Sequence, residues 1–458
     1  MNQPFPFEAF LMFGFFSALL LAGVMLRAWV GFIQKLLFPA SLIGGLIGFA
    51  AVNIYGFGMD EELIKSFAYH FFNISFISVG LTPPECDPGT QGSGRVIFRG
   101  SLWMAVLQAA TFSLQALVGA FLVYIFMLTG TELFESFGFL VPLAFNEGPG
   151  QALSIGRAWE GAGFSDASSI GLSFAAMGFF FAFFAGVPLA ALGLRRRGGL
   201  KGRPDSFFVR GILPADQKAR SAGSVTTHSS NIDCLAFHLA QAGLAYLITY
   251  FLVRSIALMV PADAAGILWG FFFLFGLVTA ILLRKLIEAT PMGRLMDPGL
   301  QRRITAGAID YLIVATGCGI QLVVIWQYAL PILFTSVCAG VLTMVLVVFL
   351  GMRLSDYSLE RTVAMYGVVT GTVSCGLLLL RIVDPEFKTP VARETGFMNI
   401  FAVPVVGGLT VLLNVFFWRG WSLAAACLVL LAVFILSFAI LCQKRLWRQE
   451  PGSSLDKH

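Results

Sequence analysis

The chain has 458 residues, of which 57% are hydrophobic and only 12% are charged, and its formal net charge is +5. A chain this apolar buries its surface in lipid rather than in one soluble core, so we predict an all-α polytopic membrane protein. The seven cysteines include no CxxC pair, which argues against a zinc site or a disulfide framework. The excess of basic residues lies largely in loops, which indicates orientation and contact with an anionic lipid bilayer more than binding to nucleic acid, so no nucleic-acid partner is expected.

Eleven apolar runs are long enough to predict transmembrane helices. Five precede the middle of the chain, at about residues 10–32, 36–57, 67–81, 102–128 and 167–194. Six follow it, at about residues 235–260, 267–283, 304–325, 330–350, 397–418 and 421–441. No basic residue precedes the first run, so the charged start of a signal peptide is missing and we expect this run to be kept as a span.

A basic linker, residues 195–233, separates the two sets of spans. Between residues 195 and 220 it carries eight Lys or Arg residues against two Asp residues, so the positive-inside rule predicts that it is cytoplasmic. Counting spans outward from the linker places the N-terminus outside and the C-terminus in the cytoplasm. The basic loops at residues 284–303 and 444–448 then also fall on the cytoplasmic side, which supports this orientation.

Two segments, residues 139–159 and 366–381, interrupt the apolar pattern with glycine, proline and polar residues. Irregular backbone at membrane depth is tolerated only where it is buried in protein or lines a wet cavity. If either segment crossed the membrane, the later basic loops would fall on conflicting sides. We therefore predict two re-entrant loops, the first from the outside and the second from the cytoplasm, and a solute site formed by them.

The order of spans and loops predicts two inverted repeats. Residues 1–194 form the first repeat, residues 234–420 the second, and residues 421–458 an extra C-terminal helix and tail. Each repeat holds five crossings and one re-entrant loop, and an odd number of crossings gives the repeats opposite orientations. A weak echo agrees with this, because Asn73 precedes Gly80 by the same interval as Asp310 precedes Gly317. Inverted repeats with broken helices are typical of secondary transporters.

Five short motifs resemble the bacterial glutamate:sodium symporter family. They are PASLIGG at residues 39–45, EGPGQA at 147–152, GFSDA at 163–167, TGTVSCG at 370–376 and DPEF at 384–387. The resemblance covers about residues 36–418. It implies an inner-membrane protein, a homodimer that couples Na⁺ to uptake of glutamate or a related acidic amino acid or small carboxylate. It also implies an elevator-type mechanism with no cofactor beyond the coupling ion. At the first loop the best-known members carry GHGTG where this chain reads GPGQA.

The candidate substrate and ion ligands lie at the two interruptions and in two spans. Helix starts point N–H groups at an anion, and unwound carbonyls suit a small cation. The first interruption contributes Asn146, Glu147, Gly148, Gly150, Gln151 and Ser154; the second contributes Thr370, Gly371, Thr372, Ser374 and Arg381; the spans contribute Asn73 and Asp310. Glu147, Asn73 and Asp310 are the candidate Na⁺ ligands, since hard cations prefer oxygen.

Each candidate has a structural alternative. Glu147 sits equally well at the wet mouth of the first loop, and the amides and hydroxyls equally well cap helix ends. Arg381 has a neighbouring carboxylate in Asp384, and Asp310 near a helix start favours the helix dipole. At the level of function, a proton-coupled or uncoupled organic-anion transporter or an anion channel stays open. An enzyme is not expected, because neither a GxSxG nor an HExxH pattern is present.

Overall fold

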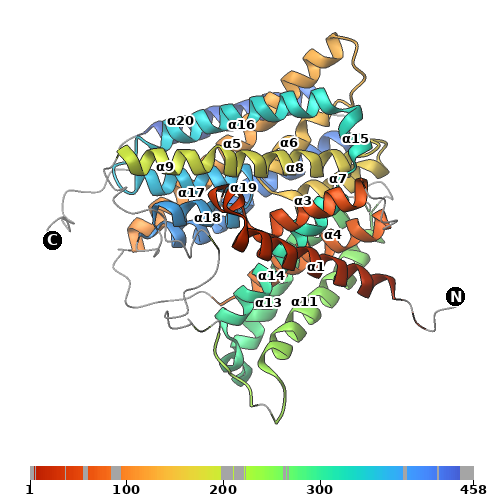
Figure 1. The fold of residues 1–458 in the computed structure, drawn as a ribbon, viewed down its shortest axis with the longest axis vertical. Helices are drawn as coiled ribbons and strands as arrows, with labels where there is room; N and C mark the ends of the chain where they lie inside the picture. Colours follow the sequence, from red (N-terminus) through yellow and green to blue (C-terminus); the bar gives the residue numbers. More distant parts are fainter. Residues whose placement is uncertain are drawn as a thin grey trace. The chain divides into compact units, whose positions relative to one another are not determined.

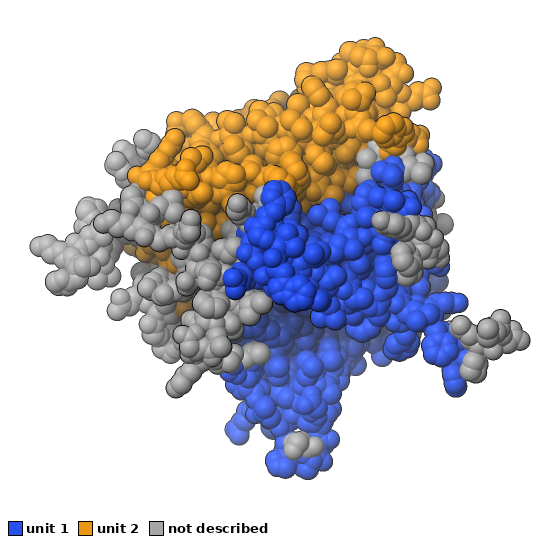
Figure 2. Space-filling model, viewed as in Figure 1, with its two compact units in different colours: residues 1–89, 149–172, 205–324 blue, residues 90–148, 173–204, 325–458 orange. Residues whose placement is uncertain are grey.

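The computed structural model describes residues 7–36, 38–54, 60–83, 94–196, 223–228, 230–260, 268–384, 389–419 and 422–443, together with residues 5, 210, 221 and 265. Within these ranges the regular structure is entirely helical (Figure 1). The chain divides into two compact units, unit 1 with residues 1–89, 149–172 and 205–324, and unit 2 with residues 90–148, 173–204 and 325–458 (Figure 2). Each unit takes residues from both halves of the chain, so the units differ from the predicted repeats.

A helix occurs at each of the eleven predicted spans. These helices are α1 (Glu8–Trp29), α3 (Ala40–Asn53), α4 (Glu61–Leu81), α5 (Gly94–Leu128), α8 with α9 (Ala167–Phe184 and Gly186–Arg196), α11 (Cys234–Ala257), α13 (Phe272–Glu288), α14 (Pro298–Gly319), α16 (Ala329–Gly351), α19 (Val391–Arg419) and α20 (Leu423–Cys442). In the described part of the chain, seven of them are long and apolar enough to cross a membrane. Helices α3, α4, α13 and α14 are shorter or more polar, so eleven crossings stays a prediction.

The outward faces of the long helices are apolar. Leu330 on α16 is 74% exposed, and Leu428 and Leu436 on α20 are similarly exposed. Large apolar side chains presented in such numbers are unfavourable in water, whereas lipid accommodates them. These surfaces therefore suit a protein embedded in a bilayer.

Unit 1 is built around the antiparallel pair α4 and α14. The Ser78 hydroxyl donates to the Gln301 carbonyl oxygen at 2.8 Å, and further along the pair Phe71 stacks on Tyr311 with ring centroids 5.1 Å apart. Helix α4 begins at Glu61 rather than near residue 67 because the Asp60 carboxylate caps it. Carboxylates near a helix start also stabilise it through the helix dipole.

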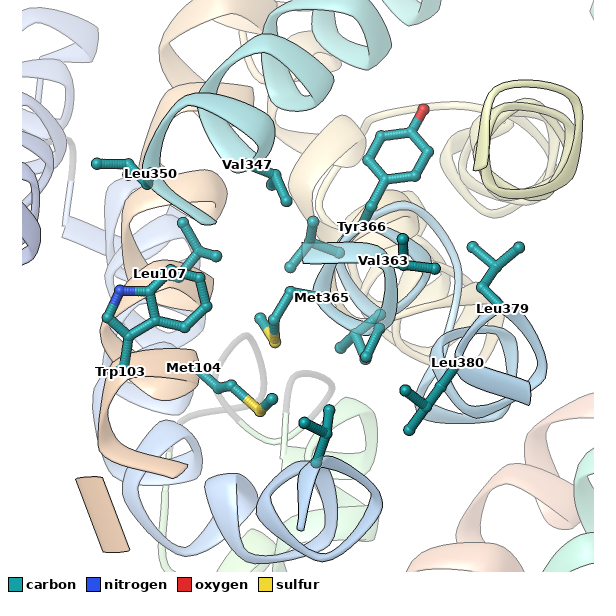
Figure 3. Close-up of a cluster of buried hydrophobic side chains, with 14 of the residues drawn as sticks. Trp103, Met104, Leu107, Val347, Leu350, Val363, Met365, Tyr366, Leu379 and Leu380 are labelled. Carbon is teal, nitrogen blue, oxygen red and sulfur yellow. The ribbon is translucent and has the colours of Figure 1, made fainter. Parts of the chain in front are cut away.

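Unit 2 is built around α5, which packs against α16, α19 and α20. Its core is a continuous apolar cluster that joins α5 and α16 to two further helices, α17 (Ser358–Thr370) and α18 (Val373–Val383) (Figure 3). The cluster includes Trp103, Met104 and Leu107 from α5, Val347 and Leu350 from α16, Val363, Met365 and Tyr366 from α17, and Leu379 and Leu380 from α18. Burial of these side chains holds α17 against α5.

Both predicted interruptions are broken helices. The first consists of a 3₁₀ turn (Phe137–Phe139), α6 (Leu140–Phe145) and α7 (Pro149–Gly161), close to the predicted residues 139–159. The second consists of α17 and α18, and it begins at Ser358 rather than at residue 366. The earlier start has a physical reason, because Arg361 in the first turns of α17 is buried in an ion pair with Glu394 of α19.

Candidate functional site

The first break lies against α5 in unit 2. The 3₁₀ turn before α6 packs against α5, so that Gly138 meets Gly119 backbone to backbone. At the end of α6, the Asn146 side-chain amide donates to the Thr111 hydroxyl at 2.9 Å. The next residue, Glu147, accepts a hydrogen bond from the Gln108 amide at 3.1 Å. The polar end of α6 is thus fixed by polar side chains of α5.

The break itself is made by Gly148, which has a φ of +90°. This left-handed conformation favours glycine, since a β-carbon would collide with the backbone. A β-carbon at Gly148 would also lie 3.1 Å from the Thr372 methyl group and 3.3 Å from the Gly371 carbonyl oxygen. The tips of the two breaks therefore lie next to each other within unit 2.

The threonine hydroxyls of the second break form hydrogen bonds at the end of α17 and at the start of α18. The Thr370 hydroxyl donates to the Tyr366 carbonyl oxygen at 2.6 Å, and the Thr372 hydroxyl accepts from the Cys375 N–H at 3.4 Å as the N-cap of α18. For these two side chains the structural role is the one observed. Arg381 is exposed in the last turn of α18, and the side chain of Ser374 lies outside the described part of the structure.

Three buried amide side chains lie near the breaks, two on α5 and one at the end of α6. In each of them the nitrogen donates a hydrogen bond and the oxygen does not accept one from any described residue. The side chains of Gln108, Gln115 and Asn146 are at most 6% exposed, and each donates through its nitrogen. Each leaves its amide oxygen buried without a hydrogen-bond partner among the described residues. Buried polar atoms normally have partners, so a set of unpaired acceptors is unusual. Gln108, Thr111 and Gln115 lie within a long apolar span and are not among the site residues predicted from the sequence.

The candidates that follow the first break belong to unit 1. Gly150 lies against the ring of Phe72, and a β-carbon there would overlap this ring. One turn of α7 carries Gln151 and Ser154, both 2% exposed. The Gln151 Oε1 and Ser154 Oγ atoms have no hydrogen-bond partner in the part of the chain that the structure describes. They lie in the first turns of α7, where free backbone N–H groups also point.

The two candidates in spans have different surroundings within unit 1. Asn73 is fully buried beside the hydroxyls of Tyr69 and Tyr246, without a hydrogen bond of good geometry to either. Asp310 is exposed and lies beside Ser41 of α3. The Asn73 amide has no hydrogen bond to Asp310 among the described residues, so their pairing as ion ligands stays a prediction.

The described residues contain no group of three or more His, Cys, Asp or Glu side chains that could hold a metal ion. A transition-metal centre would need such nitrogen, sulfur or carboxylate ligands. The polar groups at the breaks are instead amides, hydroxyls and one carboxylate. This composition suits a small organic solute or a hard monovalent cation.

The helical fold and its apolar outer faces define a polytopic membrane protein that contains two broken helices. No protein-family model, no curated protein and no solved structure matches the chain.

Proposed function

We propose that the protein is a secondary active transporter that couples Na⁺ to uptake of glutamate or a related small carboxylate. The observation that carries this proposal is the contact between the breaks, where Gly148 lies against Gly371 and Thr372. Two of the five motifs that resemble the glutamate:sodium symporter family, EGPGQA and TGTVSCG, fall on the same breaks. The contact and the motifs therefore both point to the breaks at Gly148 and Gly371.

The chemistry of a broken helix supports transport of a charged solute. Each break ends one helix with free carbonyl oxygens and starts another with free N–H groups. The carbonyl end carries a partial negative charge and the N–H end a partial positive charge. A pair of such breaks at membrane depth offers ligands for both a cation and a carboxylate, as in many transporters.

The order of elements supports an inverted repeat. Helices α1, α3, α4 and α5 precede the broken helix α6–α7 and then α8–α9, and helices α11, α13, α14 and α16 precede the broken helix α17–α18 and then α19. In our proposal these two series are the repeats, and the breaks enter from opposite sides of the membrane. A homodimer with an elevator-type movement completes the proposal, following the family that the motifs resemble.

The energetics set a requirement on coupling. A membrane potential of 100 mV contributes about 2.3 kcal/mol per elementary charge. An acidic amino acid with a net charge of −1 and a single Na⁺ move no net charge, so the potential would not drive them. We therefore expect at least two cations per solute if transport is electrogenic.

The test is uptake of radiolabelled L-glutamate into proteoliposomes with an inward Na⁺ gradient, compared with equimolar choline. We expect accumulation above the external concentration that stops when a sodium ionophore collapses the gradient. Aspartate and small dicarboxylates serve as alternative solutes. Failure to accumulate any of them under a Na⁺ gradient refutes Na⁺ symport. Accumulation driven by a proton gradient alone would establish the proton-coupled alternative, and equilibration without accumulation would indicate a channel or an uncoupled carrier.

A matched pair of glycine variants tests the site. We expect Gly371→Ala to reduce uptake at least about tenfold, because its β-carbon would lie 3.0 Å from the Cys375 sulfur at the tip of the break. Gly408→Ala in α19 is the control, since its β-carbon would meet open space. Equal uptake by the two variants at equal membrane amounts would remove Gly371 from the transport site.

A further inference from the structure

We propose that the side-chain oxygens of Gln108, Asn146 and Glu147 form a binding site for one monovalent hard cation in unit 2. The inference deepens the proposed function and rests on it, because it assigns the coupling ion to named ligands. It adds α5 to the site, through a residue that the sequence pattern did not indicate.

The amides of Gln108 and Asn146 are both oriented by hydrogen bonds from their nitrogens. Gln108 donates its amide nitrogen to a Glu147 carboxylate oxygen at 3.1 Å, and Asn146 donates its nitrogen to the Thr111 hydroxyl at 2.9 Å. Both amide oxygens stay buried and unpartnered among the described residues. A buried acceptor without a donor is unfavourable, and a bound cation is the kind of ligand that satisfies several acceptors at once.

Thr111 holds the Asn146 amide in this orientation. The Thr111 hydroxyl donates to backbone carbonyl oxygens of its own helix, at 3.0 Å to Leu107 and 3.0 Å to Gln108. Its oxygen is therefore available only as an acceptor for the Asn146 nitrogen. The Asn146 nitrogen is therefore held on Thr111, and the amide oxygen is the end left without a partner among the described residues. Thr111 is thus a positioning residue for the site.

The net charge of the proposed ligands fits a monovalent cation. The proposed site contains one carboxylate, Glu147, and neutral amide oxygens, so a monovalent cation would neutralise it. Calcium sites normally combine several carboxylates among six to eight oxygen ligands, and no group of three or more His, Cys, Asp or Glu side chains suited to a metal ion occurs in the described part of the chain. The break at Gly148 frees carbonyl oxygens at the end of α6, which are further ligands for a hard cation.

The experiment measures ion binding directly, without transported solute. Purified full-length protein in sodium-free choline buffer is titrated with ²²Na⁺ in a scintillation proximity assay, with Li⁺ and K⁺ as competitors. We expect saturable Na⁺ binding by the wild-type protein. Gln108→Met and Glu147→Gln each remove one oxygen ligand or its charge at nearly constant volume, and we expect each to weaken Na⁺ binding about tenfold or more.

Ser101→Ala is the control. Ser101 is a buried polar residue on the same helix, about two turns before Gln108, and its hydroxyl donates to the Glu394 carbonyl oxygen of α19 at 3.1 Å. Its loss removes a hydrogen bond between α5 and α19, but we expect Na⁺ affinity to stay within about twofold of wild type.

The outcomes separate this inference from the proposed function. Wild-type affinity in both Gln108→Met and Glu147→Gln overturns the site, even if Na⁺-driven uptake is observed. An equal loss in Ser101→Ala also overturns it, because the effect would then be general destabilisation of α5. Selective loss in the two site variants supports the site whether or not glutamate is the solute. If one site variant does not elute as a folded protein, the other decides.

Discussion

The buried ion pair between Arg361 and Glu394 should make the stability of unit 2 sensitive to the loss of one partner. The guanidinium donates to both carboxylate oxygens, at 2.8 Å from Nε and 2.6 Å from Nη2, and Glu394 is 0% exposed. A third hydrogen bond joins Arg361 to the Asp356 carbonyl oxygen at 3.0 Å. Arg361→Met removes all three bonds and leaves an unpaired buried carboxylate.

Breaking a buried pair by removing one partner typically costs about 3–5 kcal/mol, whereas replacing both partners with apolar residues is often close to neutral. We therefore expect Arg361→Met to lower the free energy of unfolding by about 3 kcal/mol or more. The double variant Arg361→Met/Glu394→Leu should recover most of this loss. Unfolding by sodium dodecyl sulfate in mixed micelles, followed by tryptophan fluorescence, measures these differences.

The control is the exposed ion pair of Arg157 with Glu62, whose side chains are 52% and 59% exposed. Solvent screens such a pair, so Glu62→Gln should change the free energy of unfolding by at most about 1 kcal/mol. If Arg361→Met is as stable as Glu62→Gln, or if the double variant is less stable than Arg361→Met, the buried-pair reasoning is wrong.

Three further predictions use the same unfolding and uptake assays. Gly100→Ala would place a methyl group against the Glu394 carboxylate, and we expect a loss of about 1–3 kcal/mol; unchanged stability would contradict this contact. Gly148→Ala combines an unfavourable φ of +90° with pressure on Thr372, so uptake should fall about tenfold or more, and wild-type uptake would exclude a transport role for this break. Asp297→Ala removes the N-cap of α14 and should cost about 0.5–2 kcal/mol. Although burial raises the pKa of Asp297, hydrogen bonds from backbone N–H groups lower it below its usual value of 3.8, so this stabilisation is present above that pH and is lost in acid. Equal acid sensitivity of wild type and variant would refute the assignment.

The positions of the helices could be predicted from the sequence because apolar length is a strong local signal. The run predicted at residues 330–350 is α16, Ala329–Gly351, and the run predicted at residues 421–441 is α20, Leu423–Cys442. The prediction for α5 was less complete, since the helix begins at Gly94 rather than at residue 102. Its first turns carry basic residues, and a hydropathy window does not include them even though the backbone continues as a helix.

The start of α17 could not be predicted by the same signal. Glu360 and Arg361 at its beginning are typical of a loop between spans, yet both are buried. The partner that makes burial of Arg361 favourable is Glu394, on a different helix and distant in sequence. No local pattern joins the two residues, so the charged turn could be recognised as helix only once α17 and α19 were packed together.

The candidate site shows the same division between local and tertiary signals. The break at Gly148 was predictable, because glycine and proline beside a carboxylate are rare between apolar spans. The α5 partner Gln108 was not, because averaging over a long apolar helix hides a single amide. A usable signal was nevertheless present. Gln108, Thr111 and Gln115 recur at intervals of three and four residues and so share one face of α5.

That shared face has a consequence for membrane helices in general. A polar stripe inside a long apolar span is stable only if another polar group meets it, since lipid offers no hydrogen bonds. On α5 the stripe meets Asn146 and Glu147 at one level and Thr343 of α16 at another. Searching each span for polar residues at helical spacing, rather than for its mean hydropathy, would therefore have predicted α5 as the helix that contacts the first break.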